Sequence, residues 1–195
     1  MANGARTNST CSRCTGSIFS LGLTALFLWL GFRTFSPKFS IEMFEVPTLN
    51  TTSSSKGNSE IIDPTITFDL RLKNENLNEG VLYDTIKVTL YYYQLNISTF
   101  LPIGNISIPA FYQGHGKKAH RIESILSYGV PWEVAKLEVL NGSTTMFRVD
   151  LDTKVRYKYP LWKSKRHAIM GLRVNIPVND QGVKAVKKGL RLSSD

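Results

Sequence analysis

Cysteine is scarce in this sequence. Only Cys11 and Cys14 occur among 195 residues, and both precede the one long apolar stretch. The rest of the chain cannot form a disulfide bond, so a domain there must be stabilised by its core alone. One C-x-x-C pair also gives too few ligands for a zinc site, which needs four. Next to an apolar segment the pair fits reversible palmitoylation, and two unmodified thiols explain it equally well.

Catalytic and metal-binding motifs are also absent. The sequence has no G-x-S-x-G, no H-E-x-x-H and no phosphate-binding glycine loop. Its three histidines are His115, His120 and His167, and His115 lies between two turn-forming glycines with no acidic residue or cysteine at ligand spacing. Asp69, Asp84, Asp150 and Asp152 are scattered over expected polar strand faces. We therefore predict no catalytic residue, no metal, no cofactor and no enzymatic activity.

Charge is absent from Cys14 to Phe32, where Leu, Phe, Trp, Ala and Gly leave no polar face. As a helix this stretch spans roughly 28 Å, close to the thickness of a bilayer core. We predict a transmembrane helix over 14–32 that acts as a signal anchor, after a flexible cytosolic tail over 1–13. A cleaved secretory signal is an alternative, although no small-x-small cleavage pattern follows. A buried core helix is the other alternative.

Four glycosylation sequons follow the apolar stretch, at Asn50, Asn96, Asn105 and Asn141. Each tripeptide arises often by chance, but four in one domain favour a lumenal or extracellular location. The prediction is a single-pass, type II topology with the C-terminal domain outside. The charges that flank the apolar stretch do not fix the orientation by themselves.

The residues over 37–180 alternate in the way that half-buried strands do. Between Ile66 and Leu72 every second residue is apolar, and Tyr83–Leu95 is rich in β-branched and aromatic residues. Several antiparallel strands without a βαβ rhythm predict an all-β sandwich. The segment Trp132–Leu140 fits a helix or a strand, and 181–195 reads as a basic tail. The other expected strands are Pro37–Pro47, Ile106–Phe111, Arg121–Leu126, Met146–Leu151, Val155–Tyr159 and Ala168–Val178.

The net charge is +9, and basic residues concentrate after residue 116. Outside the cytoplasm, anionic lipid or acidic polysaccharide is a more plausible partner than nucleic acid. The segment Lys154–His167 mixes cations with aromatic residues and could bind such a surface. Its alternative role is a solvated face that protects a sheet edge from aggregation. The candidate binding residues are Lys154, Arg156, Lys158, Lys163, Lys165 and Arg166.

Several landmarks resemble the plant harpin-induced-like (NHL) family, which carries a late-embryogenesis-abundant (LEA) type 2 domain. They are P-K-F-S-I-E after the apolar stretch, Asn74-Glu75-Asn76, Tyr83-Asp84 and I-P-A-F-Y-Q-G-H-G-K-K from Ile108. The family pattern has N-P-N where this chain has Glu75 in the middle, so we expect a looser turn. The matching motif residues are Asn74, Asn76, Tyr83, Asp84, Phe111, Tyr112, Gln113 and Gly114.

The resemblance implies an immunoglobulin-like sandwich at the plasma membrane that takes part in plant defence or stress signalling. The partners would be membrane or cell-wall proteins. A second possibility is a lipid-binding or anionic-surface-binding LEA type 2 module, and a hydrolase is the weakest option. The simplest interpretation of the motif residues is structural, with the aromatic ones in the core and the polar ones in turns.

Overall fold

The structure is a computed structural model that describes residues 9–31, 33–51, 63–159 and 162–194. The chain divides into two compact units, Met1–Phe35 and Ser36–Asp195. Each unit is described by itself below.

The first unit contains the helix α1, Ser9–Gly31, which has 23 residues. It begins at Ser9, ahead of the predicted start at Cys14. Near its C-terminal end the guanidinium of Arg33 lies 5.7 Å from the ring centre of Trp29. In the part of the chain that the structure describes, no helix has the length and apolarity needed to cross a membrane. The transmembrane helix predicted over 14–32 is therefore not shown, and what the structure does show is this N-terminal helix.

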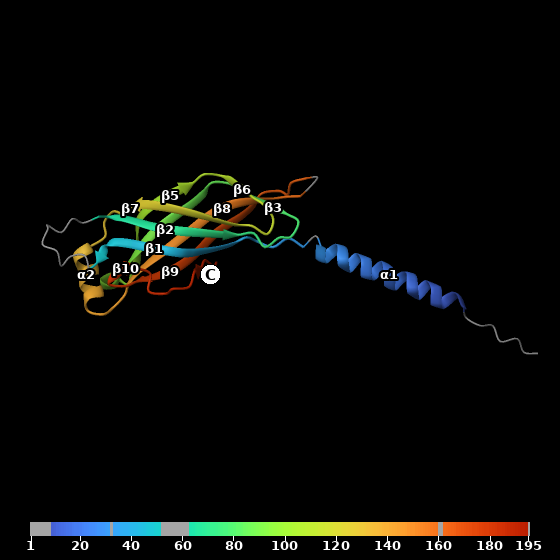
Figure 1. The fold of residues 1–195 in the computed structure, drawn as a ribbon, viewed down its shortest axis with the longest axis horizontal. Coiled ribbons are helices and arrows are strands. Elements are labelled where there is room, and N and C mark those ends of the chain that lie inside the picture. Colours follow the sequence, from blue (N-terminus) through green and yellow to red (C-terminus); the bar gives the residue numbers. More distant parts are fainter. Residues whose placement is uncertain (1–8, 32, 52–62, 160–161, 195) are drawn as a thin grey trace, which may run out of the picture. The chain divides into compact units, whose positions relative to one another are not determined.

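The second unit consists of two antiparallel sheets (Figure 1). In the first sheet β1 (Lys38–Asn50) pairs with β2 (Thr65–Lys73), which pairs with β7 (Lys118–Leu126). In the second sheet β8 (Thr145–Lys158) is central and pairs with β9 (His167–Val178) and with β3 and β4. The remaining elements are β3 (Gly80–Tyr83), β4 (Ile86–Gln94), η1 (Leu95–Ile97), β5 (Thr99–Ile108), β6 (Phe111–Gln113), α2 (Trp132–Leu140), β10 (Gln181–Val183) and β11 (Leu190–Arg191).

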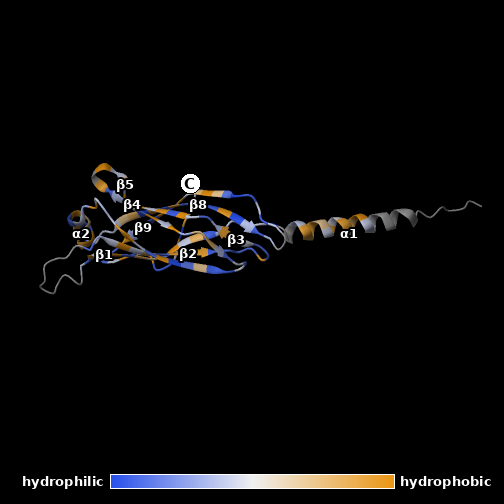
Figure 2. Cartoon of the chain, turned by 90° about the horizontal axis from the view of Figure 1, so that it is seen from above, coloured by the Kyte–Doolittle hydropathy of each residue, from blue (hydrophilic) through white to orange (hydrophobic). Residues whose placement is uncertain are grey.

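The core lies between the two sheets because each strand turns every second side chain inward. Along β2 the side chains of Ile66, Phe68, Leu70 and Leu72 are fully buried. Hydrophobic and hydrophilic residues alternate along the strands in Figure 2. Burying each large apolar side chain contributes roughly 1.5–3 kcal/mol. The predicted all-β antiparallel sandwich is confirmed.

Two strands expected separately, over 146–151 and 155–159, are one strand in the structure. The alternation continues across the gap because Thr153 takes the inward position and is buried. Its hydroxyl donates to the carbonyl of Asp84 at 3.2 Å, which satisfies a polar group in an otherwise apolar row.

For two other segments the structure goes beyond what the sequence pattern predicts. Trp132–Leu140 is helical and buries Ala135 and Val139, which lie four residues apart on one face. The residues from 181 onward, expected as a basic tail, supply β10 and β11, and both pair with β1. Strands of two or three residues are too short to show a period, so the sequence pattern did not indicate them.

Candidate functional site

One end of the sandwich collects the loops that join β2 to β3, β6 to β7 and β8 to β9 (Figure 1). Strand pairing fixes this arrangement, because Lys73 lies opposite Lys118 and Gly80 lies opposite Lys158. We define the basic end as residues 74–79, 114–117 and 158–166, of which 160 and 161 lie outside the described residues. Of the family motif residues, Asn74, Asn76 and Gly114 lie in the basic end, and the others lie within five residues of it along the chain.

The β2–β3 turn is built around Asn74, whose side chain is buried. Its Nδ2 donates to the carbonyl of Glu79 at 2.8 Å and to that of Gly114 at 3.1 Å. Its Oδ1 accepts the backbone N–H of Asn76 at 3.1 Å and the Asn76 side-chain amide at 2.8 Å. The carbonyl of Asn76 in turn accepts the N–H of Gly116 at 2.9 Å. These bonds hold together the β2–β3 and β6–β7 loops, each of which crosses from one sheet to the other.

A second buried pair joins the sheets beside this turn. The hydroxyl of Tyr83 donates to Oε1 of Gln113 at 2.7 Å. The Gln113 amide donates onward to the carbonyls of Leu72 and Lys117, at 3.1 and 2.9 Å. Burial raises the pKa of the Tyr83 hydroxyl far above its usual range, and the nearby Tyr157 adds to the shift. Tyr83 therefore stays neutral and acts as a hydrogen-bond donor.

The adjacent residues Phe111 and Tyr112 lie in different environments. The Phe111 ring stacks on Tyr83 with centres 4.8 Å apart, and Arg121 covers it at 4.1 Å. Tyr112 is exposed, and the Lys158 ammonium lies 5.2 Å from its ring centre. The predicted core position therefore holds for Tyr83, whereas Phe111 is partly buried against the core and the prediction is wrong for Tyr112.

Asp84 is the carboxylate that lies closest to the predicted basic strip. Its oxygens lie 3.7 Å from Arg156 and 3.3 Å from Arg166. Both guanidinium groups are partly exposed, so each pair contributes little to stability. Two of the six predicted strip cations are thus paired with a carboxylate.

The predicted strip does not lie on a single strand. Lys154, Arg156 and Lys158 share the outer face of β8, where they alternate with buried Val155 and Tyr157. Lys163, Lys165 and Arg166 follow on the return segment, and Lys163 is bridged to Lys158. Trp162 stacks on Tyr159 with ring centres 4.2 Å apart and 6° between the planes. The basic run is a hairpin with an aromatic pair near its tip.

Glu75 takes the place of the family's proline in the turn and lies between two lysines. It accepts a hydrogen bond from Lys38 and another from Lys73, the latter at 2.6 Å. These bonds, the one from Lys38 first, lower the pKa of Glu75 to about 2. The residue at this position thus links β1, β2 and the turn electrostatically, which the sequence did not indicate.

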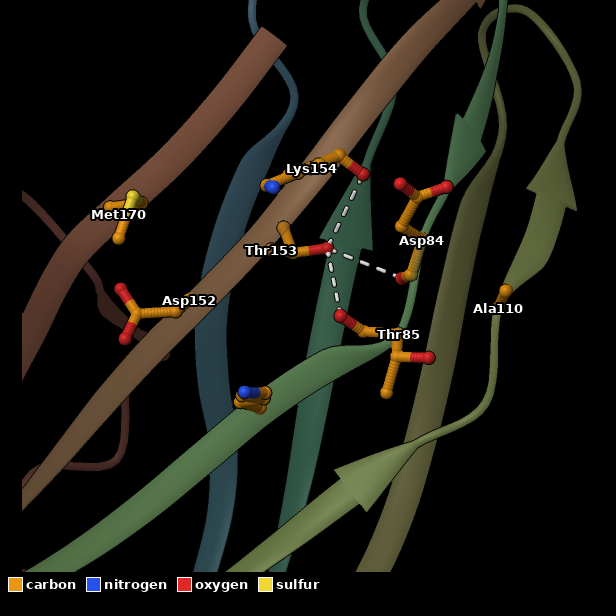
Figure 3. A pocket seen from close by; sticks show the side chains of 8 residues that line it. Asp84, Thr85, Ala110, Asp152, Thr153, Lys154 and Met170 are labelled. Atoms are coloured by element: carbon orange, nitrogen blue, oxygen red, sulfur yellow. Dashed lines mark hydrogen bonds between the residues drawn. The ribbon is translucent and has the colours of Figure 1, made fainter. Parts of the chain in front are cut away.

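An open pocket of about 540 Å³ lies where β3 passes into β4. Its lining includes Asp84, Asp152, Lys154 and Met170, and Figure 3 shows the Thr153 hydroxyl directed at backbone carbonyls beside it. The Asp152 carboxylate accepts the N–H of Gly171 at 2.7 Å and helps to close the β8–β9 bulge. The ammonium groups of Lys87 and Lys154 also line this open pocket, so it contains charges of both signs.

The remaining predicted residues are spread out. Asn50 ends β1 and is half-buried, Asn105 is exposed in β5, and Asn141 is exposed after α2. The side chains of Asn96, Cys11 and Cys14 lie outside the described part of the chain. His120 hydrogen-bonds Asp69 at 2.8 Å. Among the described residues, no three His, Cys, Asp or Glu side chains gather closely enough to hold a metal ion.

Comparison with known proteins identifies the family of this chain. No family model matches it. It is 36% identical to Protein NDR1 of Arabidopsis thaliana over 185 residues, which cover 93% of this chain and 81% of that protein. The chain belongs to the harpin-induced, NDR1/HIN1-like family. The resemblance drawn from the sequence motifs is confirmed.

A second relative in this family is NDR1/HIN1-like protein 3 of Arabidopsis thaliana. It is 31% identical over 156 residues, which cover 75% of this chain and 61% of the relative. A solved structure of a protein from Archaeoglobus fulgidus matches 75% of this chain at 10% identity, with a TM-score of 0.35.

Proposed function

We propose that this NDR1/HIN1-like protein acts in plant defence at the plasma membrane without catalysing a reaction. The observation that carries the proposal is the 36% identity to Protein NDR1 over nearly the whole chain. The motif residues support a non-catalytic role, because Asn74, Tyr83 and Gln113 use their polar atoms to hold loops together. Groups that are committed to such bonds are not available as a nucleophile or a base.

The proposed mode of action is binding to other membrane or cell-wall proteins. The sandwich offers rigid loops on a packed scaffold, which is the usual arrangement for a recognition surface. The exposed aromatic residues Tyr112 in β6 and Trp162 in the β8–β9 loop support this role, because aromatic side chains are enriched in binding surfaces.

The location is the second part of the proposal. The N-terminal segment would hold the protein to the membrane in a type II orientation, with Cys11 and Cys14 as acylation candidates. The uncharged stretch 14–32 and the exposed apolar side chains of α1, such as Phe19 and Phe27, support it. Asn105 and Asn141 are exposed residues, which a glycosyltransferase could reach.

Complementation tests the defence role. The full chain would be expressed in an Arabidopsis thaliana line that lacks Protein NDR1, and bacterial growth in the leaves would be counted. We expect the chain to lower bacterial growth toward the wild-type level. A variant without residues 1–35, expressed at the same level, should fail to do so if the membrane location matters. Unchanged bacterial growth with the full chain would contradict the proposal.

Topology is tested separately by endoglycosidase treatment of the full chain from plant microsomes. A downward shift on an immunoblot, lost in a variant with Asn50, Asn96, Asn105 and Asn141 all changed to Gln, would support an outside location. A domain that is open to protease on the cytosolic side and shows no glycan would refute it. Hydroxylamine release of a labelled acyl chain, absent in the Cys11→Ser and Cys14→Ser variant, tests palmitoylation.

A lipid-handling module is the second candidate. An acyl chain needs an enclosed apolar cavity, whereas the pocket beside Asp84 is open and lined by charged groups. The basic end favours the other form of this candidate, contact with an anionic surface. Mass spectrometry of lipid that copurifies with the protein would distinguish the two, since only a cavity retains a stoichiometric lipid.

A further inference from the structure

We infer that the basic end is a surface that docks on anionic lipid headgroups, with Leu77 and Trp162 entering the interfacial layer. The inference rests on the proposed membrane location and names the part of the domain that faces the bilayer. Four observations within the second unit carry it. They are two exposed apolar side chains, the surrounding lysines, the pairing of the nearby carboxylates and the rigidity of the loops.

The first observation is the exposure of Leu77, which is 82% and the highest among the large apolar side chains described. Leu77 is not on a loose loop. The residue before it, Asn76, is tied to Asn74 by two hydrogen bonds, and the loop is tied to Gly116. The buried motif therefore holds an apolar side chain out into solvent. An apolar side chain that is held out on a fixed loop among lysines suits insertion among lipid headgroups.

Trp162 is the second such side chain, with 61% exposure in the β8–β9 hairpin. Its ring stacks on Tyr159, so one face is supported by the protein. Indole and phenol rings prefer the membrane interface because they combine an apolar body with a polar atom. The hairpin and the Leu77 loop extend from the same end of the sandwich, since Gly80 and Lys158 are paired neighbours.

The third observation is the sign of the charge around these two side chains. Lys117, Lys158, Lys163 and Lys165 are exposed, and none forms an ion pair with a described residue. Two of the three carboxylates nearby are already paired, and the third is buried. Glu75 is held by Lys38 and Lys73, Asp84 by Arg156 and Arg166, and Glu79 is buried. The surplus is positive, and it attracts anionic headgroups electrostatically.

The opposite end of the sandwich differs. It contains η1 and α2, where Leu95, Leu137 and Leu140 are also exposed, so exposed apolar side chains alone do not distinguish the two ends. The difference is one of charge, because Glu133 and Glu138 in α2 make this end less basic. Two predicted sequons, Asn50 and Asn141, also lie there, and a hydrophilic glycan is compatible with solvent but not with lipid contact. Lipid contact is therefore inferred for the basic end alone.

An acidic polysaccharide would also attract the lysines, and Trp162 could stack on a sugar ring. A polysaccharide makes no use of an exposed leucine, whereas a lipid interface does. The exposed Leu77 is the reason to favour lipid.

The test uses the full chain with Cys11→Ser and Cys14→Ser, so that one new cysteine can be labelled with the environment-sensitive dye NBD. The dye is placed by Leu77→Cys, and by Leu137→Cys as the matched control at the other end. Each protein is reconstituted into vesicles of phosphatidylcholine with and without phosphatidylserine. We expect a blue shift and quenching by doxyl-labelled lipid at position 77 only, and a larger shift with phosphatidylserine.

A charge variant with Lys117, Lys158, Lys163 and Lys165 changed to Gln should reduce the shift with phosphatidylserine to the value in phosphatidylcholine alone. Circular dichroism confirms that the variant is folded. A position-77 dye that reports water in both vesicles, or that responds equally at positions 77 and 137, would overturn the inference. A shift with polygalacturonate but not with vesicles would also overturn it, in favour of a polysaccharide.

Flotation of the same full chain with vesicles separates this inference from the proposed location. A chain that floats while the dye at position 77 stays in water refutes only the docking surface. A chain that does not float refutes the membrane location itself.

Discussion

The hydroxyl of Tyr83 donates to Oε1 of Gln113 at 2.7 Å, and both side chains are buried between the sheets. One residue comes from β3, and the other ends β6 and bonds to the carbonyl of Leu72 in β2. The pair thus links the two sheets through a polar contact inside the core. Because no water replaces a lost partner there, the contact is more costly to break than a surface bond.

The first prediction concerns this pair. Tyr83→Phe keeps the ring that stacks on Phe111 but leaves Oε1 of Gln113 without its donor. We expect the free energy of unfolding, measured by urea denaturation, to fall by about 1–3 kcal/mol. Tyr128→Phe, at an exposed position, is the matched control and should change it by less than about 0.5 kcal/mol. Equal effects of the two substitutions would contradict the structural role of the pair.

The second prediction concerns the β2–β3 turn. Asn74→Ala removes the side-chain bonds to Glu79, Gly114 and Asn76 and leaves several buried groups unpaired. The expected loss of unfolding free energy is about 3 kcal/mol or more. Asn78→Ala changes an exposed residue of the same turn and serves as the control. Hydrogen exchange should also rise at the N–H of Gly116, and an unchanged rate there would count against the proposed network.

The third prediction is a pH dependence that arises from Glu75. Its pKa in the folded protein is about 2, below the ordinary value of 4.5, because Lys38 and Lys73 bond to its charged form. A depressed pKa stabilises the fold above pH 4.5, and this contribution is lost as the pH falls toward 2. The stability difference between the wild type and Glu75→Gln should therefore shrink over that interval. Glu45→Gln, on an exposed strand position, should show no such trend.

The salt dependence of stability is a second test of the same ion pairs. The side chains of Glu75, Lys38 and Lys73 are partly exposed, so added salt should reduce the effect of Glu75→Gln above pH 4.5. An effect that is independent of salt would show that Glu75 acts through the backbone of the turn instead.

The fourth prediction concerns the pairing of the C-terminal residues with β1. Gly182 has φ of 70°, and a Cβ there would lie 2.4 Å from the carbonyl oxygen of Val46. Gly142 has φ of 78° but nothing within 4 Å of its Cβ position, so it is a matched control for backbone strain alone. Both alanine substitutions should cost about 1–2 kcal/mol from the positive φ. Gly182→Ala should cost clearly more, as measured by thermal unfolding, and an equal cost would argue against the β10–β1 pairing.

The amino-acid sequence alone determined the class of fold. The alternation in residues 66–73 predicted a half-buried strand, and the structure buries Ile66, Phe68, Leu70 and Leu72 as expected. This is possible because the two-residue period of a strand depends only on local geometry. The family also followed from short motifs, of which F-Y-Q-G-H is the most specific.

Only the tertiary structure decided what those motifs do. Asn74 and Gly114 are 40 residues apart, and the bond between them depends on strand pairing that no local pattern reveals. Likewise, the basic run could be predicted as charged, but its folding into a hairpin beside Leu77 depends on where β8 ends and β9 begins. Local periodicity fixes which face of a strand is buried, whereas long-range pairing decides which loops meet, and the candidate surface is made of loops.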